Sequence, residues 1–512
     1  MGAPLPGEHF AVCTDEHESR PRARAPLIRP ERYAFFDKLL FAVFALAVPP
    51  FIGSNWSVFR DGDVSWHIAA GRWILEHGGV PTTDPFSFTM AGKPWVAFEW
   101  GAEVIYATAY NLASFAGLAA TVTAAMMALF AILFVHLRRK AGPIALLVTF
   151  ASTYLVLQPF VMARPHVLAW PFLAAWSAVL LSCRDRSRPP PLALAGLMLV
   201  WANVHGSYFA GFIVAAAVAL DAVIEARWDL MVIRNWFVFG MLSLLATLVN
   251  ANGIAGFLHP VTISSMSTLP AIGEWQPSTT IATPIFYFVL LATTGALLWK
   301  RSRFLIGEIL LLLVTLAMAF THIRHQSVFI ILAALIVAPK LAAAGRAEAG
   351  PLFSTPAERR LWSGAAIAAA LAILVVRTSI PIQPKETFSN PRGLLAHIPA
   401  ELRSQPVLNE YSFGGPLILA GIKPFIDGRA DMYGDAFFSD YLKIADGDRA
   451  TFDRAVRKYG IRWTMLQKGT RLVTLLDSSP EWRRLYSDKV GVIHVRRAPP
   501  IEGKDPQRQD RR

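Results

Sequence analysis

The chain has 512 residues, of which 54% are hydrophobic, and a formal net charge of +13. Soluble globular chains are closer to about 45–50% apolar, and several apolar runs here approach the roughly 20 residues that cross a bilayer. These values predict a polytopic α-helical membrane protein. The positive charge does not indicate nucleic acid as a partner. Lys and Arg are concentrated in short loops between apolar segments, as the positive-inside rule describes, and no basic face is interleaved with aromatic residues.

The first 36 residues form a polar stretch rich in Pro and Arg, which is typical of a disordered tail. Its arginines precede the first apolar segment, 37–53, so we expect the N-terminus in the cytoplasm. That segment lacks a small-residue cleavage site and is interpreted as an uncleaved anchor. It delivers 54–100 to the outside as a large external loop.

Within that loop, apolar residues recur near helical spacing over 64–76, which predicts an amphipathic helix on the membrane surface. Gly78 and Gly79 are expected to end it. The stretch that follows, with Pro81, Asp84 and Pro85, is rich in turn-forming residues.

The segment 101–137 allows two interpretations. It is long enough for two short spans with a turn at Gly117, or for one full span after a surface helix; the distribution of positive charge favours the second. The complete membrane domain, 37–376, is expected to contain about 11–13 spans. The remaining expected spans are 142–160, 165–182, 190–204, 207–224, 235–251, 284–299, 304–320, 327–344 and 361–376.

Residues 377–512 have no further apolar run long enough to span, and are expected to form a soluble α/β domain on the external side. Short strands are predicted at 406–410, 423–426, 461–467 and 490–495. Helices are predicted at 435–445 and 449–458.

Polar side chains gather at the turns that this topology places on the external side. Ionisable groups near membrane spans are costly, and they usually face a cavity or a partner. Because several turns present them on one side, we expect a single site there. The residues are His67, Arg164, His166, Asn203, His205, Ser207, Asn250, Asn252, His259, His322, Arg324, His325 and Gln326.

The acidic residues of this site are Asp61 and Asp63, two positions apart in the first external loop. Their oxygens suit a divalent cation, and one carboxylate suits the role of general base on a hydroxyl. Alternatively, the pair caps the helix that follows. The cations Arg164 and Arg324, with His67, His166, His205 and His325, suit an anionic group such as phosphate.

The soluble domain has candidates of its own, namely Glu410, Asp427, Arg429 and Asp431. The last three follow a predicted strand, where α/β sheets often bind ligands. They are expected either to bind an acceptor or to close over the membrane site. The alternative is a structural turn held by an Asp–Arg pair.

Several motifs together resemble GT-C type membrane glycosyltransferases, in particular a bacterial branch related to protein O-mannosyltransferases and to the aminoarabinose transferases of lipid A. The motifs are Arg60-Asp-Gly-Asp63, Asp84-Pro-Phe-Ser-Phe-Thr89, Glu99-Trp100, Trp201-Ala-Asn-Val-His-Gly206, Asn409-Glu-Tyr-Ser-Phe-Gly-Gly415 and Phe425-Ile-Asp-Gly-Arg-Ala-Asp-Met-Tyr433.

The resemblance implies an external active site, a polyprenyl-phosphate sugar donor and inversion at the anomeric carbon. It also implies an acidic residue of the first loop near the reacting centre, here Asp61 or Asp63. The family often has two adjacent acids, whereas Gly62 separates them here. Arg164 and His166 match functional residues of relatives by position.

The expected function is therefore that of an inverting glycosyltransferase in a bacterial inner membrane, with the C-terminal domain in the periplasm. Its partners would be the bilayer, the lipid-linked donor and an envelope acceptor with a hydroxyl or amine, and its only cofactor a divalent metal ion at Asp61 and Asp63. Two other functions are a lipid-linked sugar transporter or flippase and a non-catalytic envelope assembly factor. A transporter is disfavoured because the polar groups gather at one face and no inverted repeat is evident.

Overall fold

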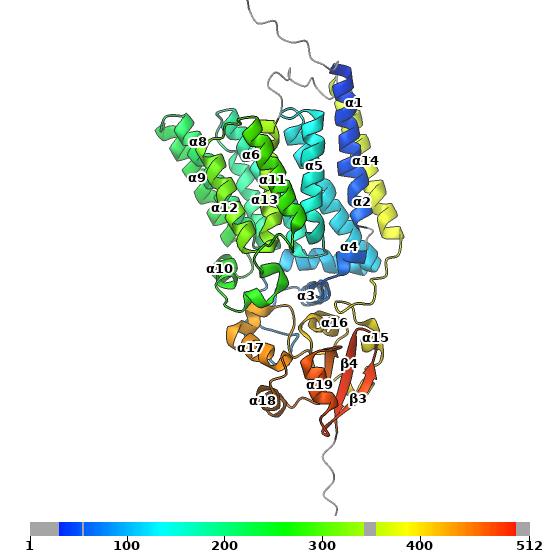
Figure 1. Ribbon diagram of the computed structural model, residues 1–512. Coiled ribbons are helices and arrows are strands. Elements are labelled where there is room, and N and C mark those ends of the chain that lie inside the picture. Colours follow the sequence, from blue (N-terminus) through cyan, green and yellow to red (C-terminus); the bar gives the residue numbers. More distant parts are fainter. Residues whose placement is uncertain (1–29, 54–55, 342–354, 498–512) are drawn as a thin grey trace, which may run out of the picture.

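The computed structural model describes residues 30–53, 56–341 and 355–497. A bundle of helices from the first three quarters of the chain, without α3 (Asp63–His77), stands above a smaller unit of helices and strands at the C-terminal end of the chain (Figure 1). We call these parts the bundle and the lower unit. Most of the expected tail, residues 1–29, lies outside the described residues.

Seven helical segments in the described part of the chain are long and apolar enough to cross a membrane, which identifies an integral membrane protein. They are α4 (Trp100–Leu137), α5 with the 3-10 turn η3 (Pro143–Phe160), α6 (Pro165–Asp185), α8 (Tyr208–Glu225), α9 (Leu230–Leu248), η7 with α13 (Ile323–Leu341) and α14 (Pro356–Ser379).

Four shorter apolar segments complete the bundle: η4 with α7 (Leu192–Val204), α10 (Gly253–Ser264), α11 (Pro284–Trp299) and α12 (Ile306–Thr321). The helices α1 (Pro30–Phe41), η1 (Ala42–Ala47) and α2 (Val48–Gly53) run on from one another through the first expected span. Each expected span therefore falls mainly on helix within the described residues, while α10 is a helix that the hydropathy pattern did not predict.

Helix α4 decides between the two interpretations of 101–137. Its backbone leaves the helical region at Ala113 and Ser114, where Ser114 has φ 53°. The part before this break lies across the lower end of the bundle, as the second interpretation expected (Figure 1). Gly117 permits the sharp bend, because a Cβ there would lie 1.9 Å from the carbonyl oxygen of Ala109.

The first loop folds between the bundle and the lower unit (Figure 1). It contains the 3-10 turn η2 (Trp56–Phe59) and α3 (Asp63–His77), which confirms the predicted helix, and Gly78 ends α3 with φ 67°. Val64, Ile68 and Ile74 are buried. The apolar face of α3 thus packs against protein, so the expected helix exists but is covered.

The lower unit contains a four-stranded sheet in the order β1-β2-β4-β3, with β1 and β2 parallel and the other pairs antiparallel. The strands are β1 (Val407–Asn409), β2 (Trp463–Gln467), β3 (Trp482–Ser487) and β4 (Gly491–Arg496). The helices are α15 (Arg392–Ala396), α16 (Gly414–Leu419), α17 (Ala430–Ala445), α18 (Arg449–Tyr459) and α19 (Arg471–Asp477).

The prediction of a strand at 423–426 is wrong. This stretch is a loop, and its amide at Phe425 donates to the side-chain oxygen of Asn409 at 2.8 Å instead of to a neighbouring strand. Strand β3, whose outer residues are exposed, was not predicted. The sheet separates two apolar cores, one including Phe452 and the other including Trp463.

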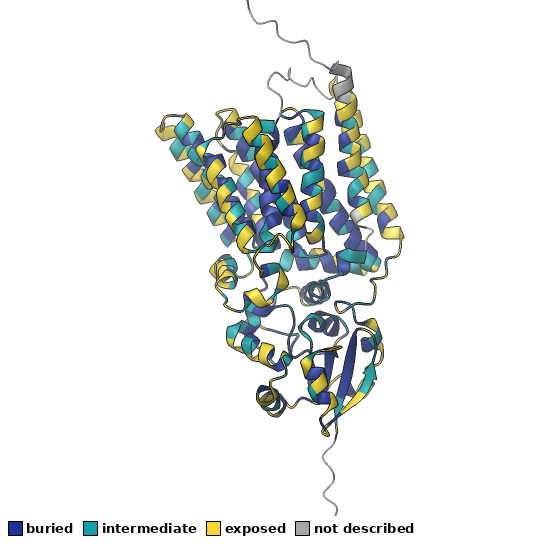
Figure 2. Cartoon of the chain, in the orientation of Figure 1, coloured by how far each residue is buried: buried dark blue, intermediate teal, exposed yellow. Residues whose placement is uncertain are grey.

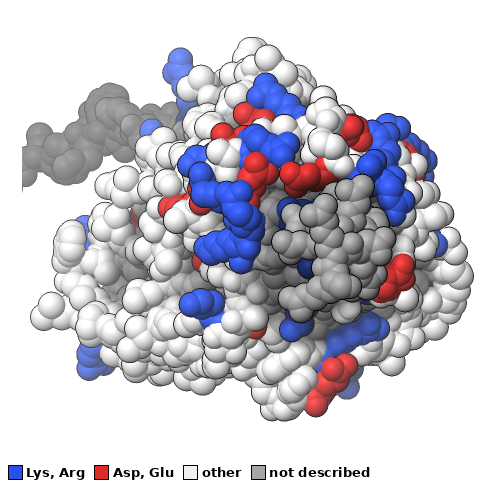
Figure 3. All heavy atoms as spheres, turned by 90° about the horizontal axis from the view of Figure 1, so that it is seen from below, with Lys and Arg blue, Asp and Glu red and all other residues white. Residues whose placement is uncertain are grey.

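Exposed side chains on the outer helices of the bundle are mainly apolar, and Figure 2 shows them along the flanks of α9, α11, α12 and α14. An apolar outer surface of this kind is what a lipid environment requires. From below, Lys and Arg are interspersed with Asp and Glu on the lower unit (Figure 3). The two surfaces therefore suit lipid and water respectively.

Candidate active site

Arg164 lies at the centre of a cluster of three carboxylates that come from two other parts of the chain. Its Nη1 is 2.9 Å from Oδ2 of Asp61 and 3.0 Å from Oε2 of Glu274, and its Nη2 is 3.1 Å from Oδ2 of Asp63. Arg164 occupies the extended N-cap position of α6, where the chain enters the helix at Pro165. The topology thus brings the predicted acidic pair and the predicted cation into direct contact.

The two aspartates have different local roles. Oδ1 of Asp61 accepts a hydrogen bond from the amide of Asp63 at 2.9 Å, which fixes the turn into α3. Asp63 is the first residue of that helix, and the N-cap is Gly62, which has no side chain to cap it. The capping alternative therefore applies in part to Asp61 and is wrong for Asp63.

Glu274 is a member of the cluster that sequence reasoning missed. It lies in the 3-10 turn η6 (Gly273–Trp275), between α10 and α11. Its Oε1 is 3.1 Å from Nη1 of Arg324, and the Arg324 guanidinium lies 4.5 Å from the centre of the Trp275 ring. Glu274 joins the two arginines, and its only sequence signal was a single acid in an apolar segment between spans.

Burial and charge set the pKa values of these acids in opposite directions. Burial and the neighbouring charge of Asp61 raise the pKa of Asp63 to about 7, against the lowering effect of Arg164. Burial also acts to raise the pKa of Glu274, but Arg164 and Arg324 outweigh it and hold that pKa at about 2. At neutral pH, Glu274 is therefore ionised while Asp63 is close to half-protonated.

The same electrostatic balance fixes the charge of Arg164. Burial acts to lower its pKa, but Glu274, Asp61 and Asp63 together raise the pKa well above its usual value. The guanidinium is therefore permanently charged. Its side chain remains 16% exposed, and those of Asp61 and Asp63 are 23% and 16% exposed, so an incoming ligand has access to all three.

A second polar group, Glu99 with His205, lies nearby. Nε2 of His205 is 3.4 Å from Oε1 of Glu99, and Nδ1 of His205 accepts the Ser207 amide hydrogen at 3.0 Å. Nε2 therefore carries the proton of the neutral ring and faces the carboxylate. Burial raises the pKa of Glu99 to about 8 and lowers that of His205 well below its usual value. Glu99 was part of the quoted Glu-Trp motif but was not expected as a site residue.

Two other predicted histidines make local hydrogen bonds. A ring nitrogen of His166 donates to the carbonyl of Phe160 at 2.8 Å, and Nδ1 of His325 donates to that of Met318 at 3.3 Å. The His166 and His205 rings are 6.3 Å apart, so His166 still borders the site.

His67 is only 1% exposed, and its Nδ1 lies 3.7 Å from a carboxylate oxygen of Glu103. Neither ring nitrogen has a hydrogen-bond partner among the described residues. The ring stays neutral, because burial lowers its pKa well below the usual value. In this arrangement His67 lies beneath the site instead of facing a ligand.

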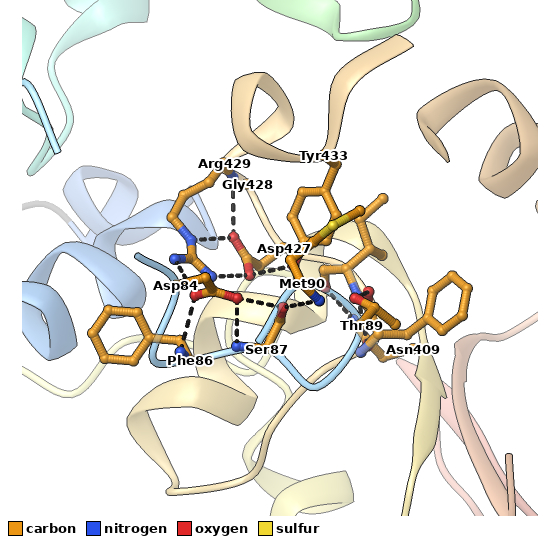
Figure 4. Close-up of polar contacts among 12 residues, drawn as sticks. Asp84, Phe86, Ser87, Thr89, Met90, Asn409, Asp427, Gly428, Arg429 and Tyr433 are labelled. Carbon is orange, nitrogen blue, oxygen red and sulfur yellow. Dashed lines mark hydrogen bonds and ion pairs between the residues drawn. The ribbon is translucent and has the colours of Figure 1, made fainter. Parts of the chain in front are cut away.

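Arg429 forms a closed network with the first loop (Figure 4). Its Nη1 donates to Asp84 at 2.7 Å, and its Nε and Nη2 donate to the two oxygens of Asp427 at 2.8 and 2.7 Å. Tyr433 donates to Asp427 at 2.7 Å, and Arg429 is 1% exposed. These contacts correspond to the alternative of a structural turn held by an Asp–Arg pair. Asp84, which lies 345 positions before Arg429 in the sequence, is the third member of the network.

Asp431, by contrast, turns toward the bundle. Its Oδ2 lies 3.0 Å from Nε2 of His259 on α10, and its charge is near enough to Glu99 to raise the pKa of that acid. Glu410 points into the lower unit, where its Oε1 accepts from the Tyr441 hydroxyl at 3.3 Å and burial raises its pKa. Asp431 therefore borders the site and Glu410 does not.

The lower unit also touches the acidic pair through glycines. A Cβ at Gly428 would lie 1.7 Å from Oδ1 of Asp63, and a Cβ at Gly415 would lie 2.3 Å from the carbonyl oxygen of Gly62. Such distances are too short for any side chain. The backbone of the lower unit is thus in van der Waals contact with the Asp-Gly-Asp turn and forms one wall of the site.

The arrangement does not fit a divalent cation at the acidic pair. Asp61 and Asp63 both have an oxygen directed at the guanidinium of Arg164, whose positive charge opposes a second cation. Within the described ranges, no three His, Cys, Asp or Glu side chains converge as metal ligands. We therefore assign no catalytic step to a metal.

The fold is that of GT-C membrane glycosyltransferases. The oligosaccharyltransferase AglB of Archaeoglobus fulgidus, in complex with an inhibitory peptide and a dolichol-phosphate, superposes with TM-score 0.50 and 10% identity over 86% of this chain and 69% of that one. Its apo form gives 0.51 and 11% identity over the same shares.

ArnT of Cupriavidus metallidurans, bound to undecaprenyl phosphate, superposes with TM-score 0.48 and 12% identity over 89% of this chain and 97% of that one. No family model and no curated protein matches the sequence. Because folds host many chemistries, function has to be argued from the residues of the site.

Proposed function

We propose, from the GT-C fold and the Arg164 cluster, that this chain is an inverting membrane glycosyltransferase that uses a polyprenyl-phosphate sugar as donor. The acceptor is a hydroxyl or amine of an envelope molecule, reached at the external face of a bacterial inner membrane. The observation that carries the proposal is the contact of Arg164 with Asp61, Asp63 and Glu274 at the end of the bundle beside the lower unit.

The arginines supply the donor-binding half of the site. A guanidinium binds phosphate through two parallel hydrogen bonds, so Arg164 and Arg324 suit the phosphate that links lipid and sugar. Glu274 bonds to both and keeps them oriented. A lipid-phosphate donor is supported by the dolichol-phosphate in the AglB complex.

Asp63 is the better candidate for the general base. A base is most effective when its pKa lies near the working pH, and the pKa of Asp63 is about 7. The Asp61 carboxylate instead holds the turn into α3 through one oxygen and Nη1 of Arg164 through the other. We assign Asp61 a positioning role and Asp63 the proton transfer.

The reaction follows from these assignments. The acceptor oxygen or nitrogen attacks the anomeric carbon as the bond from that carbon to the phosphate oxygen breaks. The acceptor proton passes to Asp63, and the charge that develops on the departing phosphate is stabilised by Arg164. A single displacement of this kind inverts the anomeric configuration.

The proposal is tested by sugar transfer in proteoliposomes from a radiolabelled polyprenyl-phosphate sugar. We expect Asp63→Asn to reduce transfer by about 10³-fold and Asp61→Asn by about 10-fold, since a missing base costs about 10²–10⁴ in rate. Asp453→Asn, in an exposed ion pair on α18, is the control and should leave transfer unchanged.

Full transfer by both loop variants would contradict the catalytic assignment. Movement of the labelled lipid across the bilayer without transfer would instead identify a transporter. If wild-type protein neither transfers nor transports any donor tested, a non-catalytic role in assembly gains support.

A further inference from the structure

A large cavity opens at the end of the bundle opposite the candidate active site. It lies between the C-terminal ends of α4 and α6 and the N-terminal end of α14, and its volume is about 1300 Å³. Apolar side chains such as Phe134, Val135 and Val179 form one part of its wall. The proposed glycosyl transfer makes no use of this cavity.

The remainder of the wall is strongly cationic. Within the described part of the chain, the lining includes no Asp or Glu, but it includes Arg138, Arg139, Lys140, Arg186, Arg188 and Arg359.

Within the described ranges, two of these cations form an ion pair with a carboxylate. Arg138 lies 3.9 Å from Asp37, and Lys140 lies 2.7 Å from Asp185. Among the residues that the structure describes, the other four form no ion pair. The cavity therefore concentrates positive charge that the described residues leave largely without a carboxylate partner.

Two of the uncompensated cations are held on a defined turn. The amide of Arg188 donates to the carbonyl of Cys183 at 2.9 Å across Ser187, which has φ 51°, and a run of three prolines follows. Proline restricts the backbone, so Arg186 and Arg188 are presented with little loss of conformational entropy.

The N-terminal end of α14 forms another part of the cavity wall. Thr355 and Glu358 form a capping box there, and Arg359 follows in the first turn. The N-terminal end of a helix carries partial positive charge, so a cation in this turn is unfavourable for the helix and adds to the positive potential of the cavity. Helix stability alone does not account for Arg359 at this position.

We infer that this cavity binds an anionic phospholipid, with the headgroup phosphate among the four unpaired arginines and an acyl chain along the apolar wall. A soluble anion would leave the apolar wall uncovered, and a zwitterionic lipid would leave the positive charge uncompensated. Other basic residues at the same end are Arg234 in the first turns of α9 and Arg301 and Arg303 between α11 and α12. They do not line the cavity and serve as a matched comparison.

The test uses the purified full chain in detergent, titrated with dioleoyl phosphatidylglycerol or dioleoyl phosphatidylcholine while the thermal midpoint is followed. We expect phosphatidylglycerol to raise the midpoint more than phosphatidylcholine does. Replacing Arg139, Arg186 and Arg188 together by Gln should weaken the apparent affinity for phosphatidylglycerol by about 100-fold, or about 2.7 kcal/mol.

The control replaces Arg234, Arg301 and Arg303 by Gln, which removes the same charge from the same end of the bundle. It should keep the wild-type response, as should the Arg139, Arg186 and Arg188 triple variant to Lys. Equal loss in the two Gln variants would show a general surface potential and would overturn the inference. An equal response to the two lipids, or no response of the wild type, would also overturn it. Since none of these measurements involves sugar transfer, their outcome is independent of the proposed activity.

Discussion

Two arginines each bind the first loop through carboxylates, yet their surroundings differ. Arg164 contacts Asp61, Asp63 and Glu274 in a cluster whose side chains are 16–23% exposed. Arg429 contacts Asp84 and Asp427, and none of these three side chains is more than 1% exposed. One cluster is open to a ligand, and the other is sealed.

The two clusters also differ in how their polar groups are paired. Every side-chain nitrogen of Arg429 and every carboxylate oxygen of Asp84 and Asp427 has a hydrogen-bond partner. The guanidinium also lies 5.2 Å from the ring of Phe86 and 4.7 Å from that of Trp95. The Arg164 cluster leaves Asp63 with a pKa raised to about 7. A buried ion network in which every polar atom is hydrogen-bonded stabilises the structure. An accessible cluster that contains an acid with a strongly shifted pKa is instead typical of a functional site.

Arg164→Gln should give the largest effect on activity. We expect transfer to fall by about 10³-fold with little change in thermal midpoint, because the variant loses the charge that stabilises the leaving phosphate. Initial rates with saturating donor provide the measurement, and Arg457→Gln on the exposed face of α18 is the control. If Arg164→Gln unfolded the protein, the contrast with Arg429 would be lost.

Arg429→Met should give the largest effect on stability. Breaking a buried network by removing one partner costs about 3–5 kcal/mol, and here it leaves Asp84 and Asp427 buried without a cation. Limited proteolysis of the lower unit and its thermal midpoint test this, with Arg429→Lys expected to be intermediate. A normal midpoint with lost transfer would instead make Arg429 part of the reaction.

Gly428 lies between the two clusters, because it precedes Arg429 in the chain and packs against Asp63, and the variant to test is Gly428→Ala. The new methyl group would collide with Oδ1 of Asp63, so we expect transfer to fall by about 10–100-fold through displacement of the base, as misplacement of catalytic groups does. Gly79→Ala, in the first loop that also carries Asp63, has open space around its Cβ and should be neutral. Unchanged transfer by Gly428→Ala would mean that the lower unit does not position Asp63.

The smallest effect is the pH dependence that Asp63 confers. Its ionised fraction falls as pH drops through about 7, so transfer should fall about tenfold between pH 8 and pH 6. A carboxyl whose folded pKa lies above its unfolded value loses its stabilising contribution as pH rises through the folded pKa. Asp63→Asn should therefore raise the thermal midpoint more at pH 8 than at pH 5. A flat pH–rate profile in the wild type would contradict Asp63 as the base.

The sequence by itself determined the features that depend on composition and local pattern. Hydropathy predicted the helical segments of the bundle, although about 11–13 spans were expected and seven described segments are long and apolar enough to cross a membrane. Helical spacing predicted α3, and the alternation of short elements predicted the α/β character of the lower unit. The acidic pair and Arg164 were also identified, because charged residues at the ends of apolar segments are conspicuous. Weaker signals failed: the stretch 423–426 is a loop, and in β3 Trp482 alone is buried.

Only the tertiary structure decided which charges meet. Asp61 and Arg164 are 103 positions apart, and Asp84 and Arg429 are 345 apart, so no local pattern links them. In sequence, Asp427 with Arg429 was as consistent with a ligand site as with a structural turn, and Glu274 gave almost no signal. Burial distinguishes them, because the free energy of a charge depends on the solvent and partners around it, and these are set by how distant segments pack.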